Sequence, residues 1–314
     1  MADYDIACDL RDGNLFAACN AKQLKGLREH KALWERYGHR ELELLEGASV
    51  KREVNSERYV GALVDHSGGH MHPLNLVLGE AAAFESRGGT IYEQTPVTRL
   101  AHGDPVQLTT PGGVVRAARV VMAGNAYLQG VLPELEASPC PAAPRSSPPS
   151  HWSRRVPGTV AERHGGGRLQ LSVGLLPFHR RQPAALWGRR QLWGQDPNDI
   201  EAVIRPKMEK TFPSLKDVGV EYAWSGTFLM TLNRLPQFGV LNDNVYYAQG
   251  YSGHGVTCTH LAGRLIAEVM TGRDERFDAF AGLPHLPFPG GRMLRVPLSA
   301  IGAWYYQTRD RLGL

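Results

Sequence analysis

Cysteine is scarce in this chain, and long apolar runs are absent. The 314 residues contain four cysteines that lie far apart with no CxxC pair: Cys8, Cys19, Cys140 and Cys258. This spacing argues against a disulfide framework or a zinc knuckle. No run of about 18 apolar residues could span a membrane, and the N-terminus lacks the basic-then-apolar layout of a signal peptide. The sequence therefore predicts a soluble, cytoplasmic protein that does not act at a membrane.

Charge is nearly balanced overall, but it is unevenly distributed. The chain has 35 Lys and Arg against 31 Asp and Glu. The Arg-rich segment, residues 141–195, contains nine arginines, one acidic residue and no lysine, which gives it +8 and leaves −4 for the rest. It lacks the lysines and the interleaved periodicity of a nucleic-acid-binding face. We expect no nucleic-acid partner, although a basic nucleic-acid-binding module remains an alternative.

Hydrophobic periodicity predicts several helices and strands. Helices are expected at 21–38, 73–88, 199–212 and 256–270, with a short last helix near 300–311. Strands are expected at 90–93, 95–100, 106–110, 114–117, 119–123, 220–231 and 245–249, and 59–64 is a short apolar stretch. The continuous apolar run at 119–123 is typical of a buried parallel strand.

A glycine-rich loop, GYSGHG at 250–255, lies between a predicted strand and a predicted helix. Its backbone N–H groups and the positive end of the helix would stabilise an electron-rich ligand atom. A tight connection without a ligand explains the same pattern, so both interpretations stay open. The chain contains no GxGxxG motif that opens a βαβ unit, the usual signature of a dinucleotide site.

Three histidines, His66, His70 and His72, lie close enough in sequence to suggest a metal site. No pattern of carboxylate or cysteine partners accompanies them. We expect no metal, and instead a role in a turn, a helix cap or the polar wall of a pocket.

Four collinear blocks, 72–100, 119–135, 204–239 and 249–270, resemble the FAD-dependent D-amino-acid and amine oxidase (DAO) superfamily. The resemblance runs from about residue 4 to the end, except over the Arg-rich segment. It implies an α/β, Rossmann-like FAD-binding flavoprotein of two domains, with α+β character in the substrate part. It also implies FAD as the cofactor, and oxygen and a small-molecule amine as partners. The implied reaction is oxidative deamination of a primary amine such as γ-glutamylputrescine to an aldehyde, ammonia and hydrogen peroxide. The oligomeric state is not indicated.

The resemblance also implies roles for individual residues. The backbone of Val97 would contact the adenine end of FAD, and Gly124 and Asn125 would lie beside the pyrophosphate and ribose. Amides of the 250–256 loop would face the isoalloxazine carbonyl and stabilise the anionic reduced flavin; the residues carried over are Gly250, Ser252, Gly253, His254, Gly255 and Val256.

Three further residues would line the substrate cavity: His72, Trp224 and Arg234. Core packing is an equal alternative for Trp224, and a structural ion pair is one for Arg234. Because the flavin carries the redox chemistry, no protein acid or base is assigned.

The resemblance divides the chain into interleaved domains. Residues 1–58 are expected to be a helical part of the substrate domain, and 59–140 a segment of the FAD domain. The substrate domain continues over 141–234, the FAD domain over 235–272, and a tail with a helix over 273–314.

Two features depart from the family pattern. The sequence starts downstream of the family's strand, GxGxxG loop and helix, so we expect weak FAD binding and little or no turnover, and a non-catalytic fragment remains an alternative. The codons of residues 142–152 can also be chosen so that reading from the third base gives GTQVIATEPL, a family-like strand. We therefore expect 141–195 to be frameshifted and disordered or misfolded, with a genuine Arg- and Pro-rich loop as the alternative.

Overall fold

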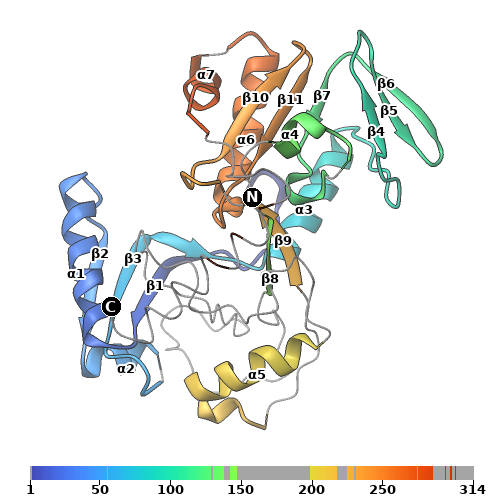
Figure 1. Cartoon of the computed structure of the whole chain (residues 1–314). Helices are drawn as coiled ribbons and strands as arrows, with labels where there is room; N and C mark the ends of the chain where they lie inside the picture. The colour runs from blue at the N-terminus through green and yellow to red at the C-terminus, as the bar shows by residue number, and fades with distance from the viewer. Residues whose placement is uncertain are drawn as a thin grey trace.

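The computed structural model describes residues 2–54, 56–128, 130–137, 142–146, 199–217, 225–229, 231–273 and 275–285, and single residues at 294, 298 and 301. Four small sheets and the helices between them form this part of the chain (Figure 1). The lower part in Figure 1 holds β1, β2, β3, α1, α2 and α5, and the upper part holds β10, β11, β7, α6 and α7.

An antiparallel sheet with the order β1-β3-β2 forms one core of the lower part. Its strands are β1 (Arg11–Ala18), β2 (Leu42–Glu46) and β3 (Gly61–His70), with α2 (Ala48–Glu53) after β2. Helix α1 (Ala21–Arg36) begins after Asn20, whose side-chain oxygen accepts a hydrogen bond from Gln23 N at 2.9 Å. Leu24 and Leu27 of α1 pack against Leu63 of β3, so the helix covers one face of the sheet.

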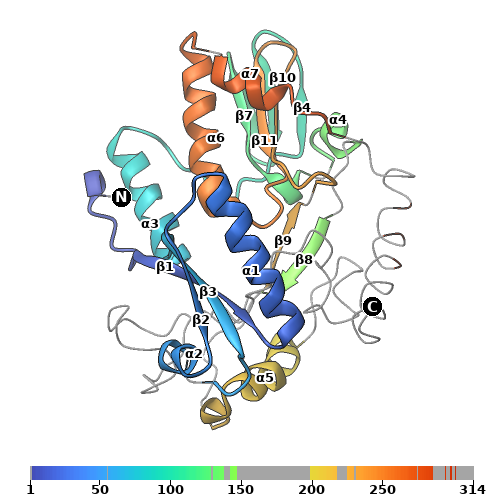
Figure 2. The same ribbon diagram turned by 90° about the vertical axis from the view of Figure 1, so that its left-hand side faces the viewer.

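The sheet of the upper part has the order β10-β11-β7. β10 (Gln237–Leu241) and β11 (Val245–Gln249) are antiparallel, whereas β11 and β7 (Val120–Met122) are parallel. Helix α6 (Gly255–Met270) lies along this sheet (Figure 2), and α7 (Glu275–Ala281) follows it. Leu265 and Ile266 of α6 share a core with Phe238, Tyr246 and Phe277.

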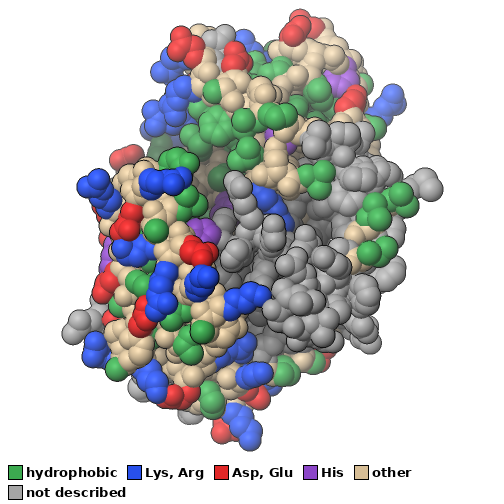
Figure 3. Space-filling model, turned by 60° about the vertical axis from the view of Figure 1, so that its left-hand side comes forward, with side chains coloured by type: hydrophobic (Ala, Val, Ile, Leu, Met, Phe, Trp, Pro, Cys, Tyr) green, Lys and Arg blue, Asp and Glu red, His purple; other side chains and the backbone are tan. Residues whose placement is uncertain are grey.

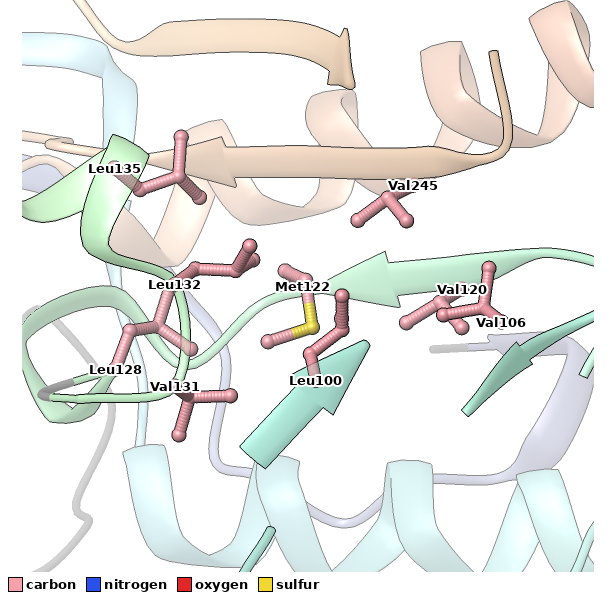
Figure 4. Packing of buried hydrophobic residues seen from close by; sticks show 9 residues of the cluster. All are labelled: Leu100, Val106, Val120, Met122, Leu128, Val131, Leu132, Leu135 and Val245. Carbon is pink, nitrogen blue, oxygen red and sulfur yellow. The ribbon is translucent and has the colours of Figure 1, made fainter. Parts of the chain in front are cut away.

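A second core of the upper part lies between β7, β11 and a three-stranded meander (Figure 4). The meander consists of β4 (Arg99–Ala101), β5 (Val106–Thr110) and β6 (Gly113–Ala117). The turn η2 (Asn125–Tyr127) and helix α4 (Pro133–Ala137) follow β7. Leu128, Leu132 and Leu135, which lie in or beside these two elements, belong to the same cluster. Their packing holds the chain that directly follows β7 in place.

Helix α3 (Pro73–Ser86) begins with Pro73 at its first turn, where a missing N–H costs nothing. The remaining elements are η1 (Ala2–Tyr4), α5 (Ile200–Thr211), η5 (Pro213–Leu215) and an antiparallel pair, β8 (Ala142–Ser146) with β9 (Ser225–Leu229).

The predicted helices at 21–38, 73–88, 199–212 and 256–270 are confirmed, as are the hairpin at 106–117 and the parallel strand within 119–123. The strand predicted at 90–93 is wrong, and only Arg99 and Leu100 of the predicted strand 95–100 belong to β4. Ile91 and Tyr92 are exposed, so their β-favouring side chains find no sheet face to pack on.

Two expectations about domains need correction. Residues 1–58 are not simply helical, because they contain β1 and β2. The expected boundary between 58 and 59 cuts a sheet, because β3 pairs with both of these strands.

Within the segment expected to be disordered or misfolded, 141–195, the structure describes Ala142–Ser146, whose backbone pairs with β9, and the expectation for the segment stays a prediction. The rest of the Arg-rich segment, residues 220–224 of the predicted strand at 220–231, and nearly all of the last predicted helix lie outside the described residues.

Candidate cofactor-binding site

Two turns meet at one edge of the upper sheet. Val120 lies opposite Val245, and Met122 opposite Tyr247, in a parallel register. The carboxyl ends of β7 and β11 therefore lie side by side, and each strand is followed by a glycine turn, at Gly124 and at Gly250. Ligands of open α/β sheets bind in the crevice outside the carboxyl ends of the strands.

A hydrogen bond joins the two turns. The side-chain oxygen of Asn125 accepts from Gly250 N at 3.1 Å. Both residues have left-handed backbones, with φ of 47° at Asn125 and 72° at Gly250, which asparagine and glycine tolerate best. A Cβ on Gly124 would lie 2.5 Å from Cδ2 of Leu128, so a larger residue there would require this buried side chain to shift. The sequence GNA after β7 therefore has a local structural reason.

Ser252 is held by neighbouring chain rather than left open. Its N donates to Leu229 O at 3.1 Å, and its Oγ accepts from Thr231 N at 3.2 Å and bonds Gly250 O at 3.1 Å. Its φ is 55°, an uncommon conformation for a serine. Sequence reasoning missed Thr231, because no local pattern reveals a contact between residues 21 positions apart.

The amino end of α6 follows directly. His254 occupies the N-cap position and makes no capping hydrogen bond through its side chain. A Cβ on Gly255 would find no atom within 4 Å, so neither packing nor a positive φ demands glycine there. The first N–H groups of a helix lack intrahelical acceptors and carry partial positive charge. The loop therefore fits a ligand group with an electron-rich oxygen, such as the isoalloxazine carbonyl of FAD.

Three buried residues, Gln237, Gln249 and Tyr251, form a layer in and next to the loop. Gln249 Nε2 donates to Gln237 Oε1 at 3.0 Å, and both side chains are buried. Tyr251 is also buried, and desolvation together with the nearby Cys258 raises its pKa to about 12. This layer carries no charge near neutral pH, so it does not oppose negative charge on a ligand.

The structure gives His72 a definite local role. It is the N-cap of α3, where its Nδ1 accepts from Asn75 N at 3.2 Å, and the residue is 7% exposed. The expected capping role is thus confirmed. Its role toward a substrate stays a prediction.

The other predicted site residues are placed as follows. Val97 is half-buried against the core that contains Met122 and Val245. Arg234 is exposed, has φ of 65°, and its N donates to Thr231 O at 3.3 Å, in the loop that contacts Ser252. Trp224 lies outside the described residues.

His66 lies on the lower sheet, with Nε2 3.2 Å from Oε2 of Glu43. Among the residues that the structure describes, no three histidine, cysteine or carboxylate side chains gather where they could hold a metal ion. In the same part of the chain, no helix has the length and apolar character needed to cross a membrane.

Residues 1–269 match the family described as DAO, FAD dependent oxidoreductase. The chain belongs to this family. It is 51% identical over 315 residues to the gamma-glutamylputrescine oxidoreductase of Escherichia coli strain K12, an alignment that covers 99% of this chain and 74% of that protein. A probable oxidoreductase, OrdL, of Haemophilus influenzae is 34% identical over 98% of this chain and 72% of its own length.

Solved structures share the fold. A glycine oxidase from Bacillus cereus superposes with a TM-score of 0.63 at 17% identity, over 87% of this chain and 76% of that one. A glycine oxidase from Geobacillus kaustophilus gives 0.61 at 19%, over 85% and 73%. The predicted family, α/β flavoprotein fold and FAD cofactor are therefore confirmed, and the chain is an FAD-dependent oxidoreductase.

Proposed function

We propose that this chain oxidises γ-glutamylputrescine, or a primary amine of similar shape, to the aldehyde, ammonia and hydrogen peroxide. The observation that carries the proposal is 51% identity to a gamma-glutamylputrescine oxidoreductase across almost the whole chain. The glycine loop after β11 and the uncapped amino end of α6 support it, because they suit a cofactor that gains negative charge on reduction.

In this proposal the chain's own residues bind and orient. FAD, when bound, would supply the redox chemistry: it would take a hydride from the amine carbon as the nitrogen loses a proton, and oxygen would reoxidise it to give hydrogen peroxide. Water would hydrolyse the resulting imine to the aldehyde and ammonia. The N–H groups of Gly253, Gly255 and Val256 would stabilise the negative charge on the cofactor, whereas those of Gly250, Ser252 and His254 already donate to Asn125, Leu229 and Tyr251. Val97, Gly124 and Asn125 would contact its adenine, pyrophosphate and ribose portions. His72 and Arg234 would line the substrate cavity, together with Trp224, which lies outside the described residues.

Peroxide release tests the substrate assignment. The purified chain, supplied with excess FAD, is expected to turn over slowly because it binds FAD weakly, and the hydrogen peroxide that it does release is expected with γ-glutamylputrescine and far less with putrescine or glycine. A faster reaction with glycine, or none with any amine while FAD is bound, would overturn the assignment of a γ-glutamylated amine.

We also propose that FAD binds this chain weakly. No GxGxxG motif stands in its 314 residues, and this motif is the usual cradle of the dinucleotide pyrophosphate. The chain is expected to lose its flavin on a desalting column. Quenching of flavin fluorescence measures how tightly FAD binds. A yellow protein that retains one FAD per chain after desalting would contradict this.

The origin of the Arg-rich segment is tested on DNA. We propose that reading-frame slips near codons 140, 155–167 and 195 produced this segment. We also propose, as a separate point, that the protein works in the cytoplasm. A coding sequence without single-base insertions or deletions at these places, relative to a homologous gene, would make the segment a genuine loop.

A further inference from the structure

The glycine loop is tied to a second loop that the family assignment does not explain. That second loop, residues 231–236, lies between β9 and β10. Its first residue, Thr231, is 2% exposed and lies beneath Ser252. The backbone N of Thr231 donates to Ser252 Oγ at 3.2 Å, and the two hydroxyl oxygens are also 3.2 Å apart. A buried polar side chain at this place makes specific bonds to the loop that we assign to the cofactor.

The hydroxyl protons can be accounted for. Thr231 Oγ1 donates to Leu235 O at 2.7 Å, so its single proton is used there. The proton of Ser252 then goes either to Gly250 O at 3.1 Å or to Thr231 Oγ1 at 3.2 Å. In both arrangements Ser252 Oγ still accepts from Thr231 N. Both hydroxyl groups of the pair are therefore engaged with protein atoms.

The 231–236 loop is itself anchored. Asn233 Nδ2 donates to Pro284 O at 2.7 Å, and Asn233 Oδ1 accepts from Leu235 N at 3.1 Å. The second bond fixes Leu235, whose carbonyl accepts from Thr231. The chain after α7 therefore supports Thr231 through two residues of one loop.

We propose that Thr231 and Ser252 form a positioning pair that holds the Gly250–Gly255 loop in the conformation that receives FAD. This inference rests on the proposed cofactor role of that loop. The pair fixes Ser252 at its left-handed φ of 55°, a conformation with an intrinsic cost for a non-glycine residue. Three hydrogen bonds compensate for that cost: Ser252 donates to Leu229 O and to Gly250 O, and it accepts from Thr231 N.

The test replaces the Thr231 hydroxyl and measures the loop directly. Thr231→Val keeps the shape and removes the hydroxyl, whereas Thr231→Ser keeps the hydroxyl. Thr110→Val is the matched control, since Thr110 Oγ1 bonds Gly113 O at the turn of a distant hairpin. Hydrogen–deuterium exchange is followed in the peptide over residues 249–257, first without FAD and then across an FAD titration.

Loss of one hydrogen bond shifts an opening equilibrium by about three- to tenfold. Thr231→Val is expected to speed exchange in this peptide by about that factor, and to raise the FAD concentration for half-maximal protection similarly. Thr231→Ser and Thr110→Val are expected to match the parent. Because the two residues act as one unit, adding Thr231→Val to Ser252→Ala is expected to change little beyond Ser252→Ala alone.

An unchanged exchange rate of the 249–257 peptide in Thr231→Val would overturn the proposed pair. So would a double variant whose exchange rate rises by the product of the factors measured for Thr231→Val and Ser252→Ala alone. Faster exchange without any change in FAD protection would overturn its role in cofactor binding. These readouts contain no amine, so they are separate from failure of the proposed substrate, which only the peroxide assay reports.

Discussion

Gly255 and Gly263 both lie in α6, but we expect a functional need for glycine only at Gly255. Neither has an atom within 4 Å of an added Cβ, and neither has a positive φ. Gly255 lies at the amino end of α6 beside the proposed cofactor, whereas Gly263 is exposed in mid-helix. Alanine in a helix is favoured over glycine by about 0.5–1 kcal/mol. Gly263→Ala should therefore raise the free energy of unfolding by about this amount and leave FAD binding unchanged.

Gly255→Ala should also be neutral or stabilising, but it should weaken FAD binding about tenfold or more, as expected for a methyl group placed where a ligand must approach the backbone. Urea unfolding and FAD fluorescence titration of both variants make the comparison. Equal FAD affinity in Gly255→Ala and Gly263→Ala would show that no ligand approaches Gly255.

At the scale of elements, an ion pair joins two helices that are far apart in sequence. His260 of α6 contacts Val256 O through Nδ1 and Glu80 of α3 through Nε2. The hydrogen bond to the Val256 carbonyl is the main cause that raises the pKa of His260 above its usual 6.5. The interaction with Glu80 raises this pKa further. A raised pKa in the folded state stabilises the protein below the unfolded pKa, and this contribution is lost as the pH rises through the folded value.

Glu80→Gln should therefore lower stability at about pH 6 and have little effect at about pH 9. The pair is about half exposed, so the loss at low pH should be about 0.2–1 kcal/mol. Urea unfolding at the two pH values measures it. Glu85→Gln, an exposed carboxylate of the same helix, controls for the loss of a negative charge. A loss that is equal at both pH values would rule out the pair as its source.

The elements that sequence could predict are those with local signals. The start of α3 is signalled by Pro73 after His72, and the hairpin of β5 and β6 by the Pro-Gly-Gly turn between its strands. β1 was missed because RDGNLFAA shows no alternation, and its strand conformation depends on pairing with β3, about 50 residues away. The contact of Thr231 with Ser252 is likewise set by the fold, so the glycine loop was predictable but its support was not.

At the scale of the whole molecule, apolar side chains are exposed on α3 and on β7. Of the apolar residues in α3 only Leu76 is buried, whereas Leu74, Val77 and Leu78 are more than half exposed. β7 is an edge strand in the described sheet, and Val121 is 43% exposed. Figure 3 shows hydrophobic side chains gathered on the upper part of one face, above a lower part with mixed charges.

Contiguous apolar surface and open strand edges favour self-association. Leu78→Glu should therefore reduce concentration-dependent light scattering while leaving the melting temperature within about 2 °C, because a substitution at an exposed site changes stability by roughly 0.5 kcal/mol or less. Leu76→Glu is the matched contrast. It places a charge in a buried site of the same helix and should destabilise the fold by several kcal/mol, on the order of the cost of an unpaired buried charge. A large fall in melting temperature for Leu78→Glu would mean that this face is covered in solution, and scattering equal to that of the parent would mean that association uses another surface.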